Sequence, residues 1–235
     1  MKILITNCLL RKTFDVLNIL KIRFNDHDVI YAGDESFVKL RLIYGKVNFH
    51  RLSEYNFDND LNAISEKYKN ESIIYFPIEE DITVKFYNYI NKFGSKNFRY
   101  KLPEFAKYNL SRNKNELNIF CESKKISCPK YYSEIDIKQK NYNLPLILKP
   151  INGSGSKGIK YITSENDLDV DSINFKSYFI QELLDNPKDI QAGFFLCELG
   201  EIVSFYSHKR IRTFPEHGGV SVFSKSNLNK EIRNT

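Results

Sequence analysis

The stretch that decides the fold runs from Leu144 to Ile162 and reads LPLILKPINGSGSKGIKYI. A short apolar run ends at Lys149, and a second one begins at Ile159. The segment between them contains three glycines and two serines. Both runs are too short for helices and are flanked by residues that break regular structure. The stretch therefore predicts a strand, a glycine-rich loop and a second strand.

The composition of this loop suits an anion. Glycines leave backbone N–H groups open to approach, so that several of them can converge on one negatively charged group. Lys149 stands at the end of a buried strand, where its charge is costly unless something negative meets it. These features predict a hairpin that grips phosphate. The alternative is an ordinary hairpin with a flexible tip.

Three known phosphate motifs do not account for the loop. Gly153, Gly155 and Gly158 have the spacing of a dinucleotide fingerprint, but that motif continues into a helix, whereas residues 159–162 read as a strand. No Gly-Lys-Ser/Thr closes the loop as in a P-loop. A protein-kinase loop has its lysine after the glycines, and no His-Arg-Asp or Asp-Phe-Gly follows here.

The bulk composition indicates a folded globular protein with one large domain or two small ones, since 42% of its 235 residues are hydrophobic. The net charge of +6 is spread along the chain, which favours a solvated lysine-rich surface over nucleic-acid binding. Four cysteines without Cys-x-x-Cys spacing favour a reducing compartment. No apolar run has the length of a membrane span. We expect a cytoplasmic protein with no membrane or nucleic-acid partner.

The first hundred residues alternate between strands and helices. Strands are predicted at residues 2–8, 28–31, 47–52 and 72–78, and helices at 12–24, 60–68 and 81–93. This alternation predicts a Rossmann-like parallel sheet covered on both faces. The first turn has no glycine fingerprint, so we expect no dinucleotide there. Glu79, Glu80 and Asp81 follow the fourth strand, where such sheets place ligands; they equally suit an acidic helix N-terminus.

The rest of the chain begins with a connector at residues 98–109, which marks a domain boundary. A helix is predicted at 111–125, capped by Ser111 or Asn113. Strands are predicted at 178–181, 192–197 and 202–207, with a turn at 198–201. A basic segment, 208–212, follows them, and residues 220–223 are again apolar.

In this order the segments resemble the ATP-grasp superfamily, in the branch similar to the large chain of carbamoyl-phosphate synthase. The resemblance covers nearly the whole chain. Its motifs are RNKNEL around Lys114, ISCP ending at Pro129 where the family usually has Gly-Ile-Pro-x-Pro, LPLILKP with Lys149, FIQELL with Gln181, Glu182 and Leu184, and HKRIRTFP with Arg212, followed by Gly218 and Gly219.

The resemblance implies a mixed α/β and α+β fold in three parts. Residues 1–102 would form a Rossmann-like domain, 103–180 the small ATP-grasp subdomain, and 181–235 the start of the second subdomain. It also implies phosphoryl transfer from ATP to a small carboxylate, followed by attack of an amine or thiol on the acyl phosphate. Such catalysis needs dense positive charge around the phosphates.

The same resemblance implies roles for individual residues. Lys114 and Lys149 would reach the α- and β-phosphates. Gln181, Glu182 and Leu184 would belong to the nucleotide site. The backbone of Glu182 and Leu184 would recognise the adenine, which would lie between two sheets. Asp189 would bind the ribose, with Asp185 as the alternative. The triphosphate would be covered by a flap made of Gly153, Ser154, Gly155, Ser156, Lys157 and Gly158; Lys157 equally suits a solvated loop tip.

The resemblance assigns the catalytic role to Arg212 and Arg210, which with Lys209 would face the γ-phosphate or the acyl phosphate. Arginine suits this role because its guanidinium can bind phosphate through two N–H groups. A charged strand end without a ligand is the alternative for this cluster.

The resemblance also implies Mg²⁺ held by a Glu and a Glu-x-Asn pair, which would follow Gly219. Only Glu231 stands there, so we expect an incomplete ATP-grasp domain without metal ligands. Three hypotheses remain open: a half-ligase completed by a C-terminal partner polypeptide or by a homo-oligomer, a non-catalytic nucleotide binder, and a structural interaction protein. We expect the chain alone to bind ATP weakly and not to hydrolyse it.

Overall fold

The computed structural model describes residues 1–45, 47–153, 155–184, 190–214 and 219–234. The chain divides into two compact units, Met1–Phe105 and Ala106–Thr235.

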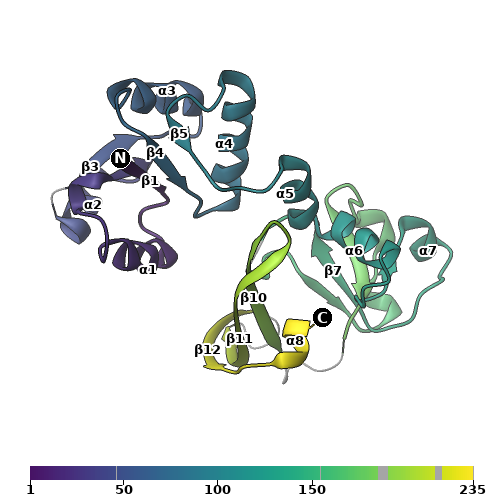
Figure 1. Cartoon of the computed structure of the whole chain (residues 1–235). Helices are drawn as coiled ribbons and strands as arrows, with labels where there is room; N and C mark the ends of the chain where they lie inside the picture. The colour runs from purple at the N-terminus through teal and green to yellow at the C-terminus, as the bar shows by residue number, and fades with distance from the viewer. Residues whose placement is uncertain (46, 154, 185–189, 215–218, 235) are drawn as a thin grey trace. The chain divides into compact units, whose positions relative to one another are not determined.

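Unit 1 is a parallel α/β sheet. Its elements are β1 (Lys2–Thr6), α1 (Arg11–Leu20), a 3₁₀ turn (Asp26–Asp28), β2 (Val29–Gly33), α2 (Phe37–Tyr44), β3 (Asn48–Arg51), α3 (Phe57–Lys67), β4 (Ile73–Phe76), α4 (Glu80–Phe93) and β5 (Phe98–Arg99). The strands pair in parallel in the order β3-β2-β1-β4-β5. Figure 1 shows α1 and α2 on one face of the sheet and α3 and α4 on the other. The predicted Rossmann-like pattern is confirmed.

Each face of this sheet has its own core because successive strand residues point to opposite faces. Leu4 of β1 packs with Leu61 of α3 and Phe86 of α4. Its neighbour Ile5 packs on the other face with Leu17 of α1, in the same cluster as Leu40 of α2. Burial on both sides explains why these strands read as continuous apolar runs.

Two elements of unit 1 lie where the sequence predicts none. Helix α2 buries Leu40 completely, but several of its other apolar side chains are exposed, so the segment has no clear amphipathic pattern. Strand β5 occupies the start of the predicted connector and pairs through Phe98 with Ile73. The connector predicted at 98–109 therefore contains regular structure at both ends, because a helix also begins at Phe105.

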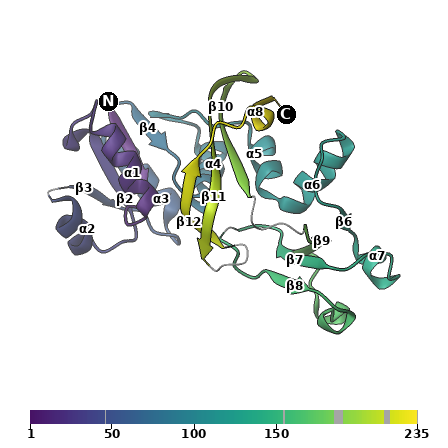
Figure 2. The same ribbon diagram turned by 90° about the horizontal axis from the view of Figure 1, so that it is seen from below.

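Unit 2 contains two antiparallel sheets. Its elements are α5 (Phe105–Arg112), α6 (Lys114–Ser123), β6 (Tyr131–Tyr132), α7 (Glu134–Lys138), β7 (Leu146–Pro150), β8 (Lys160–Ile162), two 3₁₀ turns (Glu165–Asp167 and Val170–Ser172), β9 (Tyr178–Glu182), β10 (Gln191–Glu198), β11 (Glu201–Phe214), β12 (Val220–Ser226) and α8 (Lys230–Asn234). One sheet has the order β6-β9-β7-β8 and the other β10-β11-β12. Figure 2 shows β7 beside β8 and β9.

The predicted hairpin is confirmed. Strands β7 and β8 pair antiparallel, with Leu146 opposite Ile162 and Leu148 opposite Lys160. Leu146, Leu148 and Ile162 pack in one buried cluster with Ile180 of β9. Lys149 follows Leu148 along β7, so its side chain leaves the sheet on the opposite face from this core.

Strand β11 is longer than predicted. The predicted strand ends at Ser207, whereas β11 continues to Phe214 and includes the basic segment 208–212. Pairing with β12 explains the difference, because it supplies partners for this segment, such as Ser224 opposite Arg210. Among the described residues, no helix combines the length and the apolar composition that crossing a membrane requires.

Candidate nucleotide-binding site

Lys149 is held at the end of β7 by a neighbouring strand. Its ammonium Nζ donates a hydrogen bond to Oε1 of Gln181 at 3.0 Å, and Gln181 is buried in β9. Strand pairing fixes this contact, since β9 runs antiparallel to β7 and places Gln181 opposite Ile147, two residues before Lys149. The lysine is half-buried, so its charge is positioned rather than free to sample solvent.

Lys114 is joined to the glycine loop. It is the first residue of α6, and the side chain of Asn113 caps that helix by accepting hydrogen bonds from the N–H groups of Asn115 and Glu116, each at 3.1 Å. Of the two predicted capping residues, Asn113 is confirmed. The Lys114 ammonium donates to the carbonyl oxygen of Gly153 at 2.6 Å, and the Lys114 N–H donates to that of Ile151 at 3.0 Å.

The two lysines lie close enough to repel each other. The pKa of Lys149 is lowered, chiefly because burial disfavours its charged form and secondly because of the positive charge of Lys114. Both effects are offset when an anion binds between the two ammonium groups. The sequence predicts these two residues as phosphate ligands, and the structure brings them together from a helix and a strand.

The loop between β7 and β8 has the backbone of an open anion site. Gly153, Gly155, Ser156 and Gly158 all have positive φ, with values of 103°, 72°, 60° and 74°. A Cβ atom at Gly153 or Gly155 would meet nothing within 4 Å, so this side of the loop is accessible. Gly158 is different, because a Cβ atom there would lie 3.1 Å from Cγ of Pro150.

The predicted flap contains two further residues, Lys157 and Ser154. Lys157 is exposed. This exposure is compatible with both alternatives from the sequence, a lysine that contacts phosphate and a solvated loop tip. Ser154 lies outside the described residues.

The predicted adenine hinge is only partly available. The Glu182 N–H donates to the carbonyl oxygen of Lys130 at 2.9 Å, and Oε1 of Glu182 accepts from the Lys130 N–H at 2.8 Å. These bonds tie Glu182 to the residue before β6, so its N–H group cannot read a purine. Leu184 is 63% exposed, and its side chain could cover an adenine ring. Asp185 and Asp189 lie outside the described residues.

The predicted catalytic arginines belong to the other sheet, on β11. Nη1 of Arg210 donates to the carbonyl oxygen of Gly219 at 3.4 Å, while its Nε is buried without a hydrogen-bond partner. Arg212 is exposed, and the β11–β12 register shifts on both sides of it. Such bulges redirect side chains, so alternation along the strand does not decide whether both arginines share a face.

Sequence reasoning missed the contacts that organise this site. The carbonyl oxygens of Ile151 and Gly153, which hold Lys114, carry no signal in their side chains. The positive φ of Ser156 is likewise unexpected for a residue other than glycine. Gln181 directly follows the apolar run Tyr178–Ile180, and this position in a buried strand is the one signal that could have indicated a buried polar partner for Lys149.

No protein-family model matches the sequence, and no curated protein matches it. Solved structures do match. A biotin carboxylase from Campylobacter jejuni, in complex with β,γ-ATP, has a TM-score of 0.65 at 14% identity, covering 90% of this chain and 52% of that one. An L-amino acid ligase from Bacillus licheniformis has a TM-score of 0.64 at 14% identity, and the match covers 100% of this chain and 57% of that one. A D-alanine–D-alanine ligase from Bacillus anthracis, complexed with ATP, has a TM-score of 0.56 at 13% identity, and the match covers 99% of this chain and 72% of that one.

The chain thus spans about half the length of the first two of these structures, at 52% and 57%. Sequence identities of 13–14% make the likeness one of fold. The matches cover 90% or more of this chain, so each extends over both of its units. The chain therefore shares its fold with these solved structures, and the predicted mixed fold class is confirmed.

Proposed function

We propose that the chain binds ATP through Lys114, Lys149 and the glycine loop, as the nucleotide-binding part of an ATP-dependent carboxylate–amine or carboxylate–thiol ligase. The observation that carries this proposal is a pair of mutually repelling ammonium groups beside an open loop of positive-φ residues: that of Lys149 on β7, and that of Lys114, which donates to the carbonyl oxygen of Gly153. Phosphoryl transfer depends mainly on positioning and on neutralising phosphate charge, and this arrangement provides both.

The described residues fit the nucleotide better than its metal ion. The two lysines and the loop N–H groups match a triphosphate in charge and hydrogen-bonding capacity. No group of three or more His, Cys, Asp or Glu side chains in the described part of the chain could hold a metal ion. We therefore assign no Mg²⁺ ligand and no step of catalysis to one.

For turnover we propose two further requirements. Arg210 and Arg212 would neutralise the γ-phosphate or the acyl phosphate, and further polypeptide, either a C-terminal partner or a second copy, would pack against the sheet β10-β11-β12. The support is a set of large apolar side chains exposed on these strands, among them Phe194, Phe195, Ile202, Val222 and Phe223. Exposed apolar surface of this kind marks interaction sites. The same observation supports the alternative, a non-catalytic scaffold.

Two finer proposals concern relationship and location. We propose kinship with the branch of carbamoyl-phosphate synthase, on the order of the motifs around Lys114, Lys149 and Arg212. We also propose a cytoplasmic location, on the free state of Cys8, Cys121, Cys128 and Cys197.

Calorimetric titration of the chain with ATP, ADP and AMP tests the proposed function. We expect saturable binding that weakens by roughly tenfold or more from ATP to AMP, because the site is built around phosphate charge. Adenosine serves as the uncharged control. Equal affinity for ATP and adenosine, or no heat with millimolar ATP, would contradict nucleotide binding and favour the scaffold.

We expect ATP affinity to fall as the pH rises through the alkaline range. The pKa of Lys149 is lowered in the free protein, and bound phosphate would raise it again, so ATP binding at alkaline pH takes up a proton. Below the lowered pKa the lysine is charged in both states and the affinity is constant. Calorimetry at alkaline pH in two buffers of different ionisation enthalpy measures this uptake. Proton release, or an affinity that rises with pH, would contradict the role of Lys149.

A further inference from the structure

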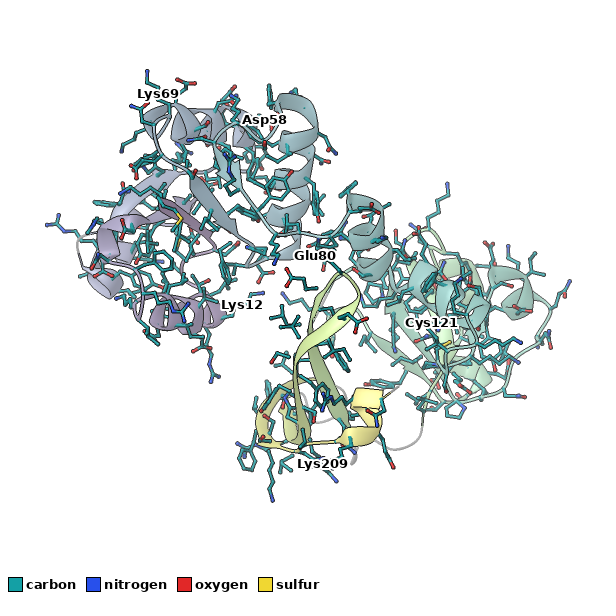
Figure 3. All side chains as sticks on the ribbon, viewed as in Figure 1. Lys12, Asp58, Lys69, Glu80, Cys121 and Lys209 are labelled. Carbon is teal, nitrogen blue, oxygen red and sulfur yellow. The ribbon has the colours of Figure 1, made fainter. Side chains whose placement is uncertain are left out.

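Cys121 and Cys128 lie on either side of the turn that ends α6. Cys121 belongs to the last turn of this helix, and Figure 3 shows it there in unit 2. Lys125 has a positive φ of 59°, and the Ile126 N–H donates back to the carbonyl oxygen of Cys121 at 2.9 Å. The Lys125 N–H donates to that of Glu122 at 3.0 Å, which completes a Schellman motif. The chain therefore reverses at Lys125 and returns along α6.

The returning segment places the Cys128 thiol against α6. Its Sγ lies 4.0 Å from the carbonyl oxygen of Asn118, which is three residues before Cys121 and thus on the same side of the helix. The Asn118 side chain fixes this arrangement, because its Nδ2 donates to the carbonyl oxygen of Pro129 at 2.9 Å and the residue is only 5% exposed. The two cysteines are therefore neighbours in space.

The charges around Cys128 agree with this placement. The pKa of its thiol is raised, chiefly by desolvation and secondly because a negative charge on Cys121 opposes one on Cys128. Glu122 and Glu182 act in the same direction. A raised pKa keeps Cys128 protonated and slow to react, so the pair is stable as two thiols. Both side chains are partly exposed, which leaves them accessible to a small oxidant.

The other two cysteines have different surroundings. Cys8 is completely buried in unit 1, where its Sγ lies 3.7 Å from the carbonyl oxygen of Ile5. Cys197 is exposed on β10, in the other sheet of unit 2. Cys197 therefore serves as a reference for a thiol that is accessible but is not part of the pair.

We propose that Cys121 and Cys128 form a reversible disulfide when the chain meets a low-molecular-weight disulfide such as oxidised glutathione. The Cys121 thiol loses its proton and attacks one glutathione sulfur, which forms a mixed disulfide and releases one glutathione thiolate. The Cys128 thiolate then attacks the Cys121 sulfur and releases the second. Two protein thiols are oxidised, one glutathione disulfide is reduced to two thiols, and the released thiolates take up the two protons.

The new bond would fix the end of α6 to the segment before β6. In the reduced chain this segment is held by the hydrogen bond from Asn118 to Pro129 and by the Lys130 N–H, which donates to Oε1 of Glu182 at 2.8 Å. A covalent link lowers the conformational entropy of the unfolded chain, so oxidation should stabilise unit 2. The disulfide does not depend on the proposed nucleotide binding, since neither cysteine belongs to that site.

Incubation of the full chain with oxidised glutathione in native buffer, followed by alkylation, trypsin digestion and mass spectrometry, tests the pair. Trypsin cuts after Lys124 and Lys125, so Cys121 and Cys128 fall in separate peptides that only the disulfide joins. We expect these peptides to be recovered as a linked pair that dithiothreitol separates. The oxidised chain should unfold several degrees higher than the reduced one.

Two serine variants make the test specific. Cys128→Ser should leave Cys121 carrying one glutathione, with no linked peptide and no gain in unfolding temperature. Cys197→Ser is the matched control and should keep both the link and the gain.

Several results would overturn the proposal. Glutathione adducts on the native chain without the linked peptide would show that the two sulfurs do not meet, and so would a link that forms only in urea. A link from Cys121 or Cys128 to Cys197 would assign the oxidation to a different pair. An unfolding temperature that the disulfide leaves unchanged would contradict its effect on unit 2.

Discussion

Replacing Lys149 with methionine is expected to weaken ATP binding by roughly a hundredfold, which corresponds to the loss of a charged hydrogen bond worth up to about 3 kcal/mol. Lys149 is half-buried, and its Nζ lies 3.0 Å from Oε1 of Gln181. The positive charge of Lys114 destabilises the charged form of Lys149. Binding of a phosphate to this ammonium group is therefore more favourable than binding to an exposed lysine. Methionine keeps the aliphatic stem, so the change isolates the charge. Calorimetric titration with ATP measures the effect.

The same substitution should change stability much less than affinity. Removing a partly desolvated charge stabilises the free protein, whereas leaving Oε1 of Gln181 without a donor costs about 1–3 kcal/mol. These contributions oppose each other, so the unfolding free energy is expected to shift by about 1–2 kcal/mol at most. Lys160→Met is the control, since this exposed lysine lies opposite Leu148 on β8. Equal loss of ATP affinity in both variants would assign the effect to general charge and not to the site.

The parts of the fold that sequence predicts are those set by local pattern. The β7–β8 hairpin follows from two short apolar runs and the breakers between them, and the parallel sheet of unit 1 follows from apolar runs buried on both faces. Helix α2 escapes prediction because Phe37, Val38, Leu42 and Ile43 are exposed and mask the single buried position, Leu40. Strand β5 escapes because two residues form it. Its existence depends on pairing with β4, which no local pattern encodes.

The candidate site also has parts that local pattern predicts and parts that depend on tertiary structure. Lys114 and Lys149 are predictable from their motifs, but their proximity depends on how α6 meets the loop through the carbonyl oxygens of Ile151 and Gly153. The partner of Lys149 is likewise a tertiary property, because Gln181 reaches it only through the pairing of β9 with β7.

Phe86→Ala is expected to lower the unfolding free energy by about 3–5 kcal/mol, the range for a large aromatic side chain removed from a core. Phe86 is 1% exposed in α4, and its ring stacks on Tyr75 with centroids 3.9 Å apart. It also meets Phe98 edge-to-face at 5.7 Å, so one side chain holds α4 to both β4 and β5. Urea unfolding measures the loss. Phe93→Ala, on the same helix but 36% exposed, is the control and should cost about 1 kcal/mol.

This substitution should act on unit 1 alone, because Phe86 lies in the core shared by the sheet of that unit and helices α3 and α4. ATP binding depends on residues of unit 2, so it should survive Phe86→Ala at temperatures where the variant is folded. Equal destabilisation by the two alanine variants would show that the core of unit 1 is not organised around Phe86.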